Sequence, residues 1–270
     1  MSTRIAVLSD LHAGSSVAPW PVDCPLSDGG HWVPNVFQRY LNDCWADMIA
    51  NLRALRPDVV VVNGDAVQGV HGDKDGQLVT SNPARQALAA RLLLEPLADC
   101  CERLYMVRGT EWHEGKCSDH VEQLAQALGA EMDASTGHYT WPALRLSVEG
   151  QIISLAHHIG TSSIPFYTAT VPQRELLTEI LEGALAYGRE APDVRCIVRS
   201  HRHRYVSVRP RPGLLAVVTP AWQYATAFGR KVAPALLPDI GYIVLESVRG
   251  VLVETPTVYA NPQPGVEVVR

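Results

Sequence analysis

The sequence predicts an α/β protein in which mixed β-sheets are covered by helices. In the first half of the chain, short apolar runs alternate with longer segments of helical periodicity. In the second half, short apolar runs follow one another through turns. Strand–helix alternation is typical of a parallel sheet with crossover helices, whereas hairpins add antiparallel strands. No Ser/Gly linker, internal repeat or low-complexity block interrupts the 270 residues, so we expect a single domain over residues 1–270.

The first half supplies three predicted strands and three predicted helices. Continuous runs of Val, Ile and Leu next to turn residues are typical of buried strands. Apolar residues at helical spacing, ended by Pro57 or Gly129, are typical of helices. The predicted strands are 5–8, 59–62 and 104–107, and the predicted helices are 36–55, 83–101 and 119–128.

The second half is dominated by short strands. Glu149-Gly150 separates the apolar segments 139–148 and 151–156, which predicts a hairpin. A helix is predicted over 171–187. Further strands are predicted at 196–199, 205–208, 214–218, 242–246 and 251–258.

The segment 13–35 carries no regular pattern and is rich in Gly, Pro and Ser. Structureless segments of this length in compact domains are usually functional or disordered, so we predict an active-site lid here. Trp20 and Trp32 lie in this segment, and Trp222 lies far along the chain. We expect core or rim packing for these three indoles, with stacking on a base or an aryl leaving group as the alternative.

Composition excludes several classes of protein. A hydrophobic content of 47% is too high for a disordered chain. With 23 basic and 28 acidic residues, the net charge of −5 gives no broad basic face for nucleic acid or membranes. No apolar stretch approaches the length of a signal sequence or a membrane span. The six cysteines form no CxxC pair, so we expect reduced thiols and a cytoplasmic protein.

Acidic and histidine side chains follow five of the predicted strands, just where each strand ends. In open α/β sheets, this is the edge at which ligands bind. We therefore expect these side chains to converge on one site. The groups are Asp10-Leu11-His12, Asp65, His113 with Glu111 and Glu114, His157-His158, and His201-Arg202-His203.

Metal binding is the chemistry that suits such a set. Imidazole and carboxylate together favour Mn, Fe, Zn, Ni or Co over Ca and Mg. Six ligands exceed what one four-coordinate zinc requires. Two divalent ions that share a bridging carboxylate are the better fit.

The ordered motifs resemble those of the calcineurin-like metallophosphoesterases, whose pattern is DxH, GDxxD, GNH[DE], a lone His and GHxH. The resemblance spans about residues 4–205. It implies a two-sheet mixed β-sandwich flanked by helices, in four αββα layers. It also implies two metal sites: one ion held by Asp10, His12, Asp65 and His203, and a second held by Asp65, His157 and His201, with Asp65 as the bridge. His157 is preferred to His158 because the family's ligand is the first such residue after the strand.

The sequence departs from the family pattern at several positions. Gln68 replaces the second Asp of GDxxD, and Ser200 replaces the Gly of GHxH. The larger departure is the stretch 109–114, which lacks the Asn of the motif and carries two extra residues before His-Glu. Glu111 or Thr110 is expected to take the place of the Asn ligand, and Glu111 is the harder ligand of the two. By resemblance, His113 is the catalytic histidine beside the scissile phosphate.

The expected function is therefore a dinuclear metal-dependent phosphoesterase that uses a metal-activated hydroxide. Mn is the first choice of ion, with Fe, Zn, Ni or Co as alternatives. An anionic Glu111 ligand would repel a monoester more than a diester, so we expect phosphodiesters to be preferred. Alternatives are a DNA or RNA nuclease of the same fold and a non-catalytic metal-binding scaffold. The expected partner is a phosphate ester, which includes a nucleotide or nucleic acid, and we expect no binding to membranes. We expect Arg108, Arg202 and Arg204 either to bind phosphate oxygens or to be solvated.

Overall fold

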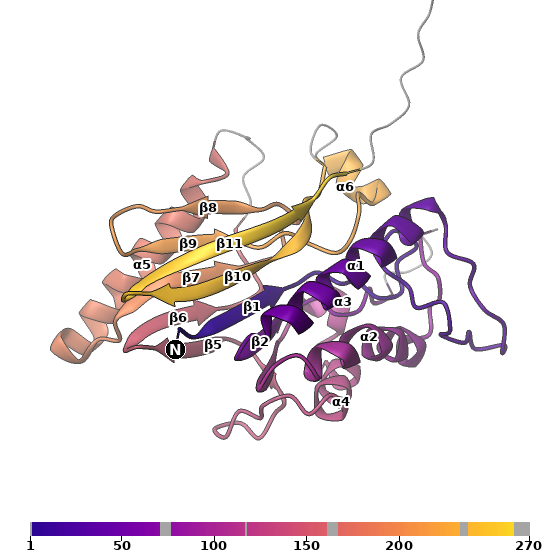
Figure 1. Ribbon diagram of the computed structural model, residues 1–270, viewed down its shortest axis with the longest axis horizontal. Helices are drawn as coiled ribbons and strands as arrows, with labels where there is room; N and C mark the ends of the chain where they lie inside the picture. Colours follow the sequence, from indigo (N-terminus) through magenta and orange to yellow (C-terminus); the bar gives the residue numbers. More distant parts are fainter. Residues whose placement is uncertain (1, 71–76, 117, 161–166, 233–236, 262–270) are drawn as a thin grey trace, which may run out of the picture.

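Two mixed β-sheets form the centre of the computed structural model, which describes residues 2–70, 77–116, 118–160, 167–232 and 237–261 (Figure 1). In the first sheet, four strands run parallel and two are antiparallel to their neighbours. Its order is β11 (Val251–Tyr259), β10 (Ile240–Val248), β1 (Arg4–Leu8), β2 (Val59–Asn63), β3 (Arg103–Val107) and β4 (Thr140–Trp141).

The second sheet is also mixed. Its three central strands are parallel, and both edge strands are antiparallel to their neighbours. Its order is β5 (Leu144–Val148), β6 (Gln151–Leu155), β7 (Val194–Arg199), β9 (Leu215–Val218) and β8 (Val206–Val208). The prediction of a two-sheet mixed sandwich is confirmed.

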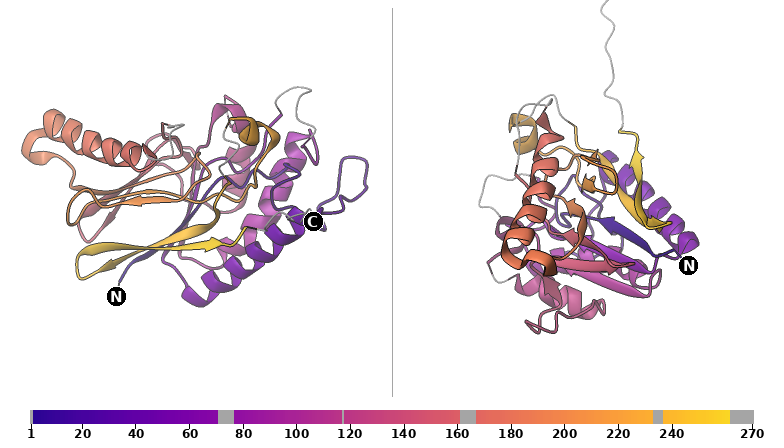
Figure 2. Two further views of the ribbon diagram at one scale, coloured as in Figure 1. Left: turned by 90° about the horizontal axis from the view of Figure 1, so that it is seen from above. Right: turned by 90° about the vertical axis from the view of Figure 1, so that its left-hand side faces the viewer.

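Side-chain alternation along the strands builds the layers. Along β1, Ile5 and Val7 face the second sheet, while Ala6 and Leu8 face the helices. The helices α1 (Val36–Leu55), α2 (Pro83–Ala98) and α4 (Asp119–Ala127) cover the outer face of the first sheet. Helix α5 (Thr170–Tyr187) covers the second sheet from the opposite side (Figure 2). These are the four αββα layers that were expected.

Helix ends follow local capping chemistry. Asn35 caps α1 through a reciprocal pair of hydrogen bonds with Gln38. Asn82 caps α2, and Pro83 occupies its first turn. Helix α2 ends at Ala98, three residues before the predicted end. The short segments α3 (Glu111–Glu114), η3 (Gly188–Glu190) and α6 (Ala227–Val232) were not predicted. None of the helices within the described ranges is long and apolar enough to cross a membrane.

The predicted strand 139–148 is wrong in one respect, because it is two strands in different sheets. Strand β4 pairs with β3 in the first sheet, and β5 pairs with β6 in the second. Pro142 lies between them, and a proline lacks the N–H that a continuous strand would use. The predicted hairpin at Glu149-Gly150 is confirmed, with both turn residues at positive φ.

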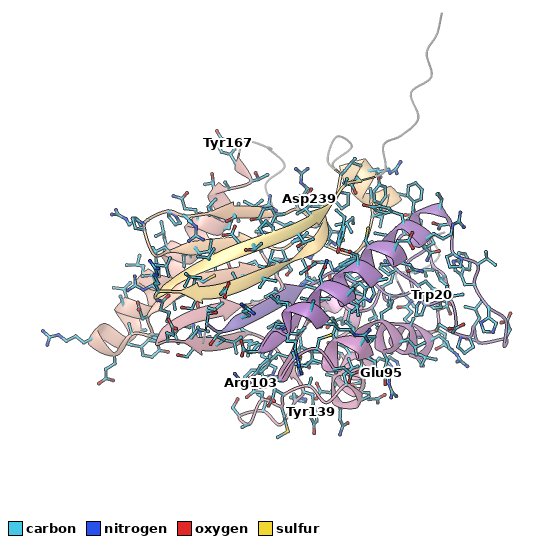
Figure 3. The ribbon with its side chains drawn as sticks, viewed as in Figure 1. Trp20, Glu95, Arg103, Tyr139, Tyr167 and Asp239 are labelled. Atoms are coloured by element: carbon cyan, nitrogen blue, oxygen red, sulfur yellow. The ribbon has the colours of Figure 1, made fainter. Side chains whose placement is uncertain are left out.

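The segment 13–35 is partly a core segment. Ala13, Ala18 and Trp20 are fully buried, and Ala13 forms a bridge with Val67 beside β2. Trp20, marked in Figure 3, and Trp222 both lie in the core, which confirms the packing interpretation for these two indoles. A lid role for the segment stays a prediction.

Candidate metal centre

The acidic and histidine side chains meet at one edge of the sandwich, although their strands belong to different sheets. Asp10 and His12 follow β1, Asp65 follows β2, and His113 follows β3. His157 follows β6, and His201 and His203 follow β7. Within each of three groups, one potential ligand atom per residue lies within 4.8 Å of the others. The groups are Asp10–His12–His203, Asp65–His157–His201 and His12–Asp65–His113.

Main-chain hydrogen bonds fix the loops that carry these residues. The Asp10 N–H donates to the Gly64 carbonyl at 3.0 Å, and the His12 N–H donates to the Asp65 carbonyl at 2.9 Å. The pairing of β1 with β2 therefore continues beyond the strands. The Asp10 carbonyl accepts in turn from the Trp222 N–H at 3.1 Å, so a third segment supports the same loop.

Five of the converging residues have left-handed backbone conformations. Non-glycine residues rarely adopt positive φ, and such residues cluster at functional sites. The turns after β1 and β2 and the loop after β7 thus all contain left-handed residues that carry site side chains. The φ angles are 54° for Asp10, 48° for His12, 50° for Asp65, 70° for His201 and 53° for His203.

Two glycines are required by close approach to these residues. A Cβ at Gly109 would lie 2.2 Å from Asp65 Oδ1. A Cβ at Gly64 would lie 2.4 Å from His157 Nδ1, and Gly64 also has a φ of 85°. Both motif glycines therefore leave room for site side chains.

Asp65 lies between two of the groups. Its side chain is 1% exposed, and Oδ2 is 3.0 Å from His157 Nε2. The same oxygen is 4.0 Å from His12 Nε2 and 4.0 Å from His201 Nδ1. Burial favours the neutral acid, but the positive charge of His157 outweighs it and lowers the pKa of Asp65. A charged carboxylate thus faces both groups of imidazoles.

A main-chain carbonyl orients the His157 ring. Its Nδ1 donates to the Asn63 carbonyl at 2.7 Å, which turns Nε2 towards Asp65. Burial alone lowers the pKa of His157, but the carboxylates of Asp65 and Asp10 raise it to about 10. His158 is exposed and belongs to none of the groups formed by the described residues.

The donor atoms fit a bound cation. Asp10 Oδ1 and His157 Nε2 are buried and make no hydrogen bond to any residue that the structure describes. His12 Nε2 lies 3.2 Å from His203 Nε2, and the latter lies 3.2 Å from Asp10 Oδ1. Ligand atoms about 2.1 Å from one ion lie roughly 3–3.4 Å apart. Divalent ions in these groups would satisfy the orphaned atoms and account for this spacing.

The sequence profile of the calcineurin-like phosphoesterases matches residues 3–205, which include all of these residues. The chain belongs to the calcineurin-like phosphoesterase family. This is a class of enzymes that use two divalent metal ions. No curated protein matches the chain at a significant level.

Solved structures similar to this calcineurin-like phosphoesterase include three from different organisms. Yfce, a phosphoesterase from E. coli, is 13% identical with a TM-score of 0.44, covering 94% of this chain and 98% of that chain. A dimetal phosphatase from Danio rerio is 13% identical with a TM-score of 0.45, covering 96% and 99%. A single mutant of Vps29 from Entamoeba histolytica is 14% identical with a TM-score of 0.40, covering 96% and 100%.

The variant family motif at 109–114 forms a loop and the short helix α3. Thr110 caps this helix, and both its N–H and its hydroxyl donate to Asp65 Oδ1, at 2.7 and 3.0 Å. Glu111 begins the helix with an exposed side chain and is in none of the three groups. The structure therefore does not bring the expected Glu111 ligand to the cluster.

Glu114 supports the site through the main chain. Its buried carboxylate accepts from the Gly109 N–H at 2.8 Å and from the Ala66 N–H at 3.2 Å. Burial and the nearby charge of Asp65 raise the pKa of Glu114 to about 7. Glu114 therefore holds together the loop that carries Asp65 and the loop that leads to His113.

His113 is also fixed by a main-chain group. Its Nδ1 donates to the Gln68 carbonyl at 2.6 Å, and its ring lies 4.4 Å from the ring of His12. The Gln68 side chain points elsewhere, because its Oε1 accepts from Gln223 Nε2 at 2.6 Å. Position 68 thus positions His113 through a backbone atom, which any residue type at this position supplies. No pattern in the sequence indicated the contact between Gln68 and Gln223.

Proposed function

We propose that this protein hydrolyses phosphodiesters with two divalent transition-metal ions, Mn being the first choice. One observation carries the proposal: a single carboxylate oxygen of Asp65 lies within 4.0 Å of imidazole nitrogens from both groups. A shared carboxylate between two clusters of nitrogen donors is the arrangement that a two-ion site requires.

The proposed ligands follow the groups. Thr110, whose hydroxyl contacts Asp65, or a water is favoured in place of the family's Asn, because Glu111 is exposed. The first ion is assigned to Asp10, His12, Asp65 and His203, and the second to Asp65, His157 and His201.

Residues of the chain supply orientation and proton transfer. Bound divalent ions supply a water of lowered pKa and offset the charge of the phosphoryl group. The Asn63 carbonyl holds His157 in the tautomer whose Nε2 is a ligand. The Gln68 carbonyl likewise fixes His113 with Nδ1 protonated, so Nε2 is the atom that would deliver a proton to the leaving oxygen.

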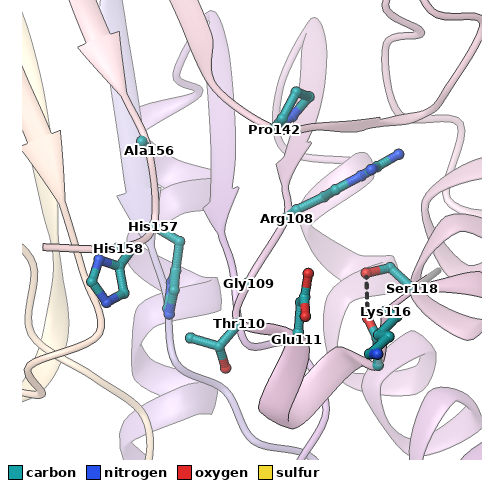
Figure 4. Close-up of a pocket in the computed structure, with 11 residues that line it drawn as sticks. Arg108, Gly109, Thr110, Glu111, Lys116, Ser118, Pro142, Ala156, His157 and His158 are labelled. Atoms are coloured by element: carbon teal, nitrogen blue, oxygen red, sulfur yellow. Dashed lines mark hydrogen bonds between the residues drawn. The ribbon is translucent and has the colours of Figure 1, made fainter.

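Room for a second substituent supports the preference for diesters. A cavity of about 550 Å³ begins at Thr110 and His157, beside the proposed second ion (Figure 4). A monoester would leave this space empty, whereas the second organic group of a diester could occupy it. We also propose a cytoplasmic location, which the five free thiols among the described residues support.

Metal analysis and two substrates test the proposal. The purified protein is stripped with a chelator, reloaded with Mn²⁺, and analysed for metal by mass spectrometry. We expect close to two ions per chain, and faster hydrolysis of bis-nitrophenyl phosphate than of nitrophenyl phosphate. Metal binding without hydrolysis of either ester would favour the scaffold alternative. Faster cleavage of DNA or RNA than of any small diester would favour the nuclease.

A further inference from the structure

The cavity beside the proposed second ion has an inner wall and a charged outer part. The inner wall is formed by Thr110 and His157, which both contact Asp65. The outer part contains the side chains of Arg108, Glu111 and Lys116 (Figure 4). A ligand bound in this cavity therefore lies close to three formally charged side chains.

The two cations of the cavity have no acidic partner among the residues that the structure describes. No ion pair joins Arg108 or Lys116 to a carboxylate there. Among the described residues that line the cavity, Glu111 is the only acid, and its side chain is exposed. Two basic side chains and one acidic side chain therefore give these lining residues a net positive formal charge.

Arg108 is held in place from one side. Its Nε donates to the Thr140 hydroxyl at 2.9 Å, and that hydroxyl donates to Glu122 at 2.6 Å. The guanidinium is half-buried, and its terminal nitrogens make no hydrogen bond to the described part of the chain. A fixed guanidinium with two unused nitrogens matches the paired oxygens of a phosphate or carboxylate.

We propose that this cavity binds a second anionic group of the substrate, a phosphate or a carboxylate, and that Arg108 and Lys116 select for it. The inference rests on the proposed function and names its substrate class: small phosphodiesters that carry an additional anion on one substituent. Ligand cavities of about 300–1,000 Å³ hold molecules of nucleotide size, and this one falls in that range. Glu111 has the opposite effect, because its charge repels the same group.

Two matched substrates isolate the second anion. One is the nitrophenyl ester of thymidine 5′-monophosphate, and the other is the same ester with a 3′-phosphate. We expect the phosphorylated ester to have the lower KM at a similar kcat. In Arg108→Gln and Lys116→Gln, the KM of that ester should rise roughly ten- to hundredfold, with little change for the plain ester. Glu111→Gln should lower its KM.

Binding without turnover gives a second readout. Thymidine 3′,5′-bisphosphate is titrated calorimetrically into metal-loaded wild-type protein and into each variant. Arg211→Gln, an exposed arginine in the β8–β9 loop, is the matched control and should bind as wild type does. Thermal unfolding checks that Arg108→Gln folds, and Lys116→Gln, on an exposed loop, provides an independent variant.

The outcomes separate this inference from the proposed function. Equal KM values for both esters in an active wild-type enzyme, unchanged in the variants, would overturn the anion-binding cavity alone. Absence of hydrolysis of every ester would overturn the proposed function. Weakened second-ion binding in Glu111→Gln, with no gain for the phosphorylated ester, would show that Glu111 is a metal ligand and would overturn its role here.

Discussion

Replacement of Asp65 by asparagine removes one negative charge with almost no change in shape. The amide oxygen can still accept from the Thr110 N–H, which lies 2.7 Å from Oδ1 in the wild type. The amide nitrogen then replaces Oδ2, the atom 3.0 Å from His157 and 4.0 Å from His12. The substitution therefore removes a ligand from both proposed ions and leaves the surrounding loops in place.

The magnitude follows from linkage between metal binding and folding. An ion at a concentration of about 100 times its Kd stabilises the folded state by about 2.7 kcal/mol. For a chain of this size, that raises Tm by roughly 5–10 °C for each ion. Loss of a residue that hydrogen-bonds to a metal ligand lowers the metal affinity about 10–100-fold. Loss of a shared anionic ligand should therefore lower the affinity for both ions by at least this factor. The shift on adding metal should then fall to about half after a tenfold loss of affinity and close to zero after a hundredfold loss.

The assay compares Tm with and without Mn²⁺ in wild type and in Asp65→Asn, alongside metal content by mass spectrometry. The shift is the readout, because breaking the buried contact with His157 also lowers the Tm of the metal-free variant. Asp193→Asn serves as the control, since Asp193 is an exposed acid paired with Arg195 at 2.7 Å. Two ions and a full Tm shift in Asp65→Asn would refute the shared-carboxylate reasoning.

Three further predictions test other parts of the site. His113→Asn should retain both ions but lower kcat by about 10²–10⁴-fold, less for a nitrophenolate leaving group; loss of metal would show instead that His113 is a ligand. Chelation should abolish hydrolysis and Mn²⁺ should restore it, as a time course before and after addition would show. In the metal-free protein, the protonated His157 ring is stabilised by the carboxylates of Asp65 and Asp10, which raises its pKa to about 10. This contribution to the free energy of unfolding is complete below about pH 6.5 and is lost as the pH rises to about 10. The stabilisation by added metal should grow over the same range, because the ion displaces the Nε2 proton, and His157→Gln should flatten both trends.

Much of the fold could be predicted because its strands are short and continuously apolar. The four valines at 59–62 predicted a buried strand, and the helical spacing of apolar residues at 36–55 predicted a helix. The structure confirms both. The error at 139–148 has a different origin. Apolar periodicity indicates that residues form a strand but not which sheet they join, so the crossing at Pro142 could not be foreseen. Four-residue α3 is too short to show any helical period.

The residues of the site also differ in how well the sequence predicts their positions. Residues directly after strands converge because the carboxyl ends of parallel strands share an edge, and Asp10, Asp65 and His157 follow this rule. Glu111 does not, because Thr110 caps a helix and turns the next side chain towards solvent. A linear motif with two inserted residues gives no means of predicting that turn.

The left-handed turns at the five clustered acidic and histidine residues also bear on how an ion would be selected. Their conformations are fixed by main-chain hydrogen bonds to neighbouring loops, such as that from His12 to Asp65, and these bonds need no ion to form. An ion would therefore enter a preorganised cage and spend little of its binding free energy on ordering the chain. Exchange of one divalent ion for another should then leave the backbone unchanged. Which ion occupies the cage would be decided by the softness of its donor atoms and by the metals that the surroundings supply.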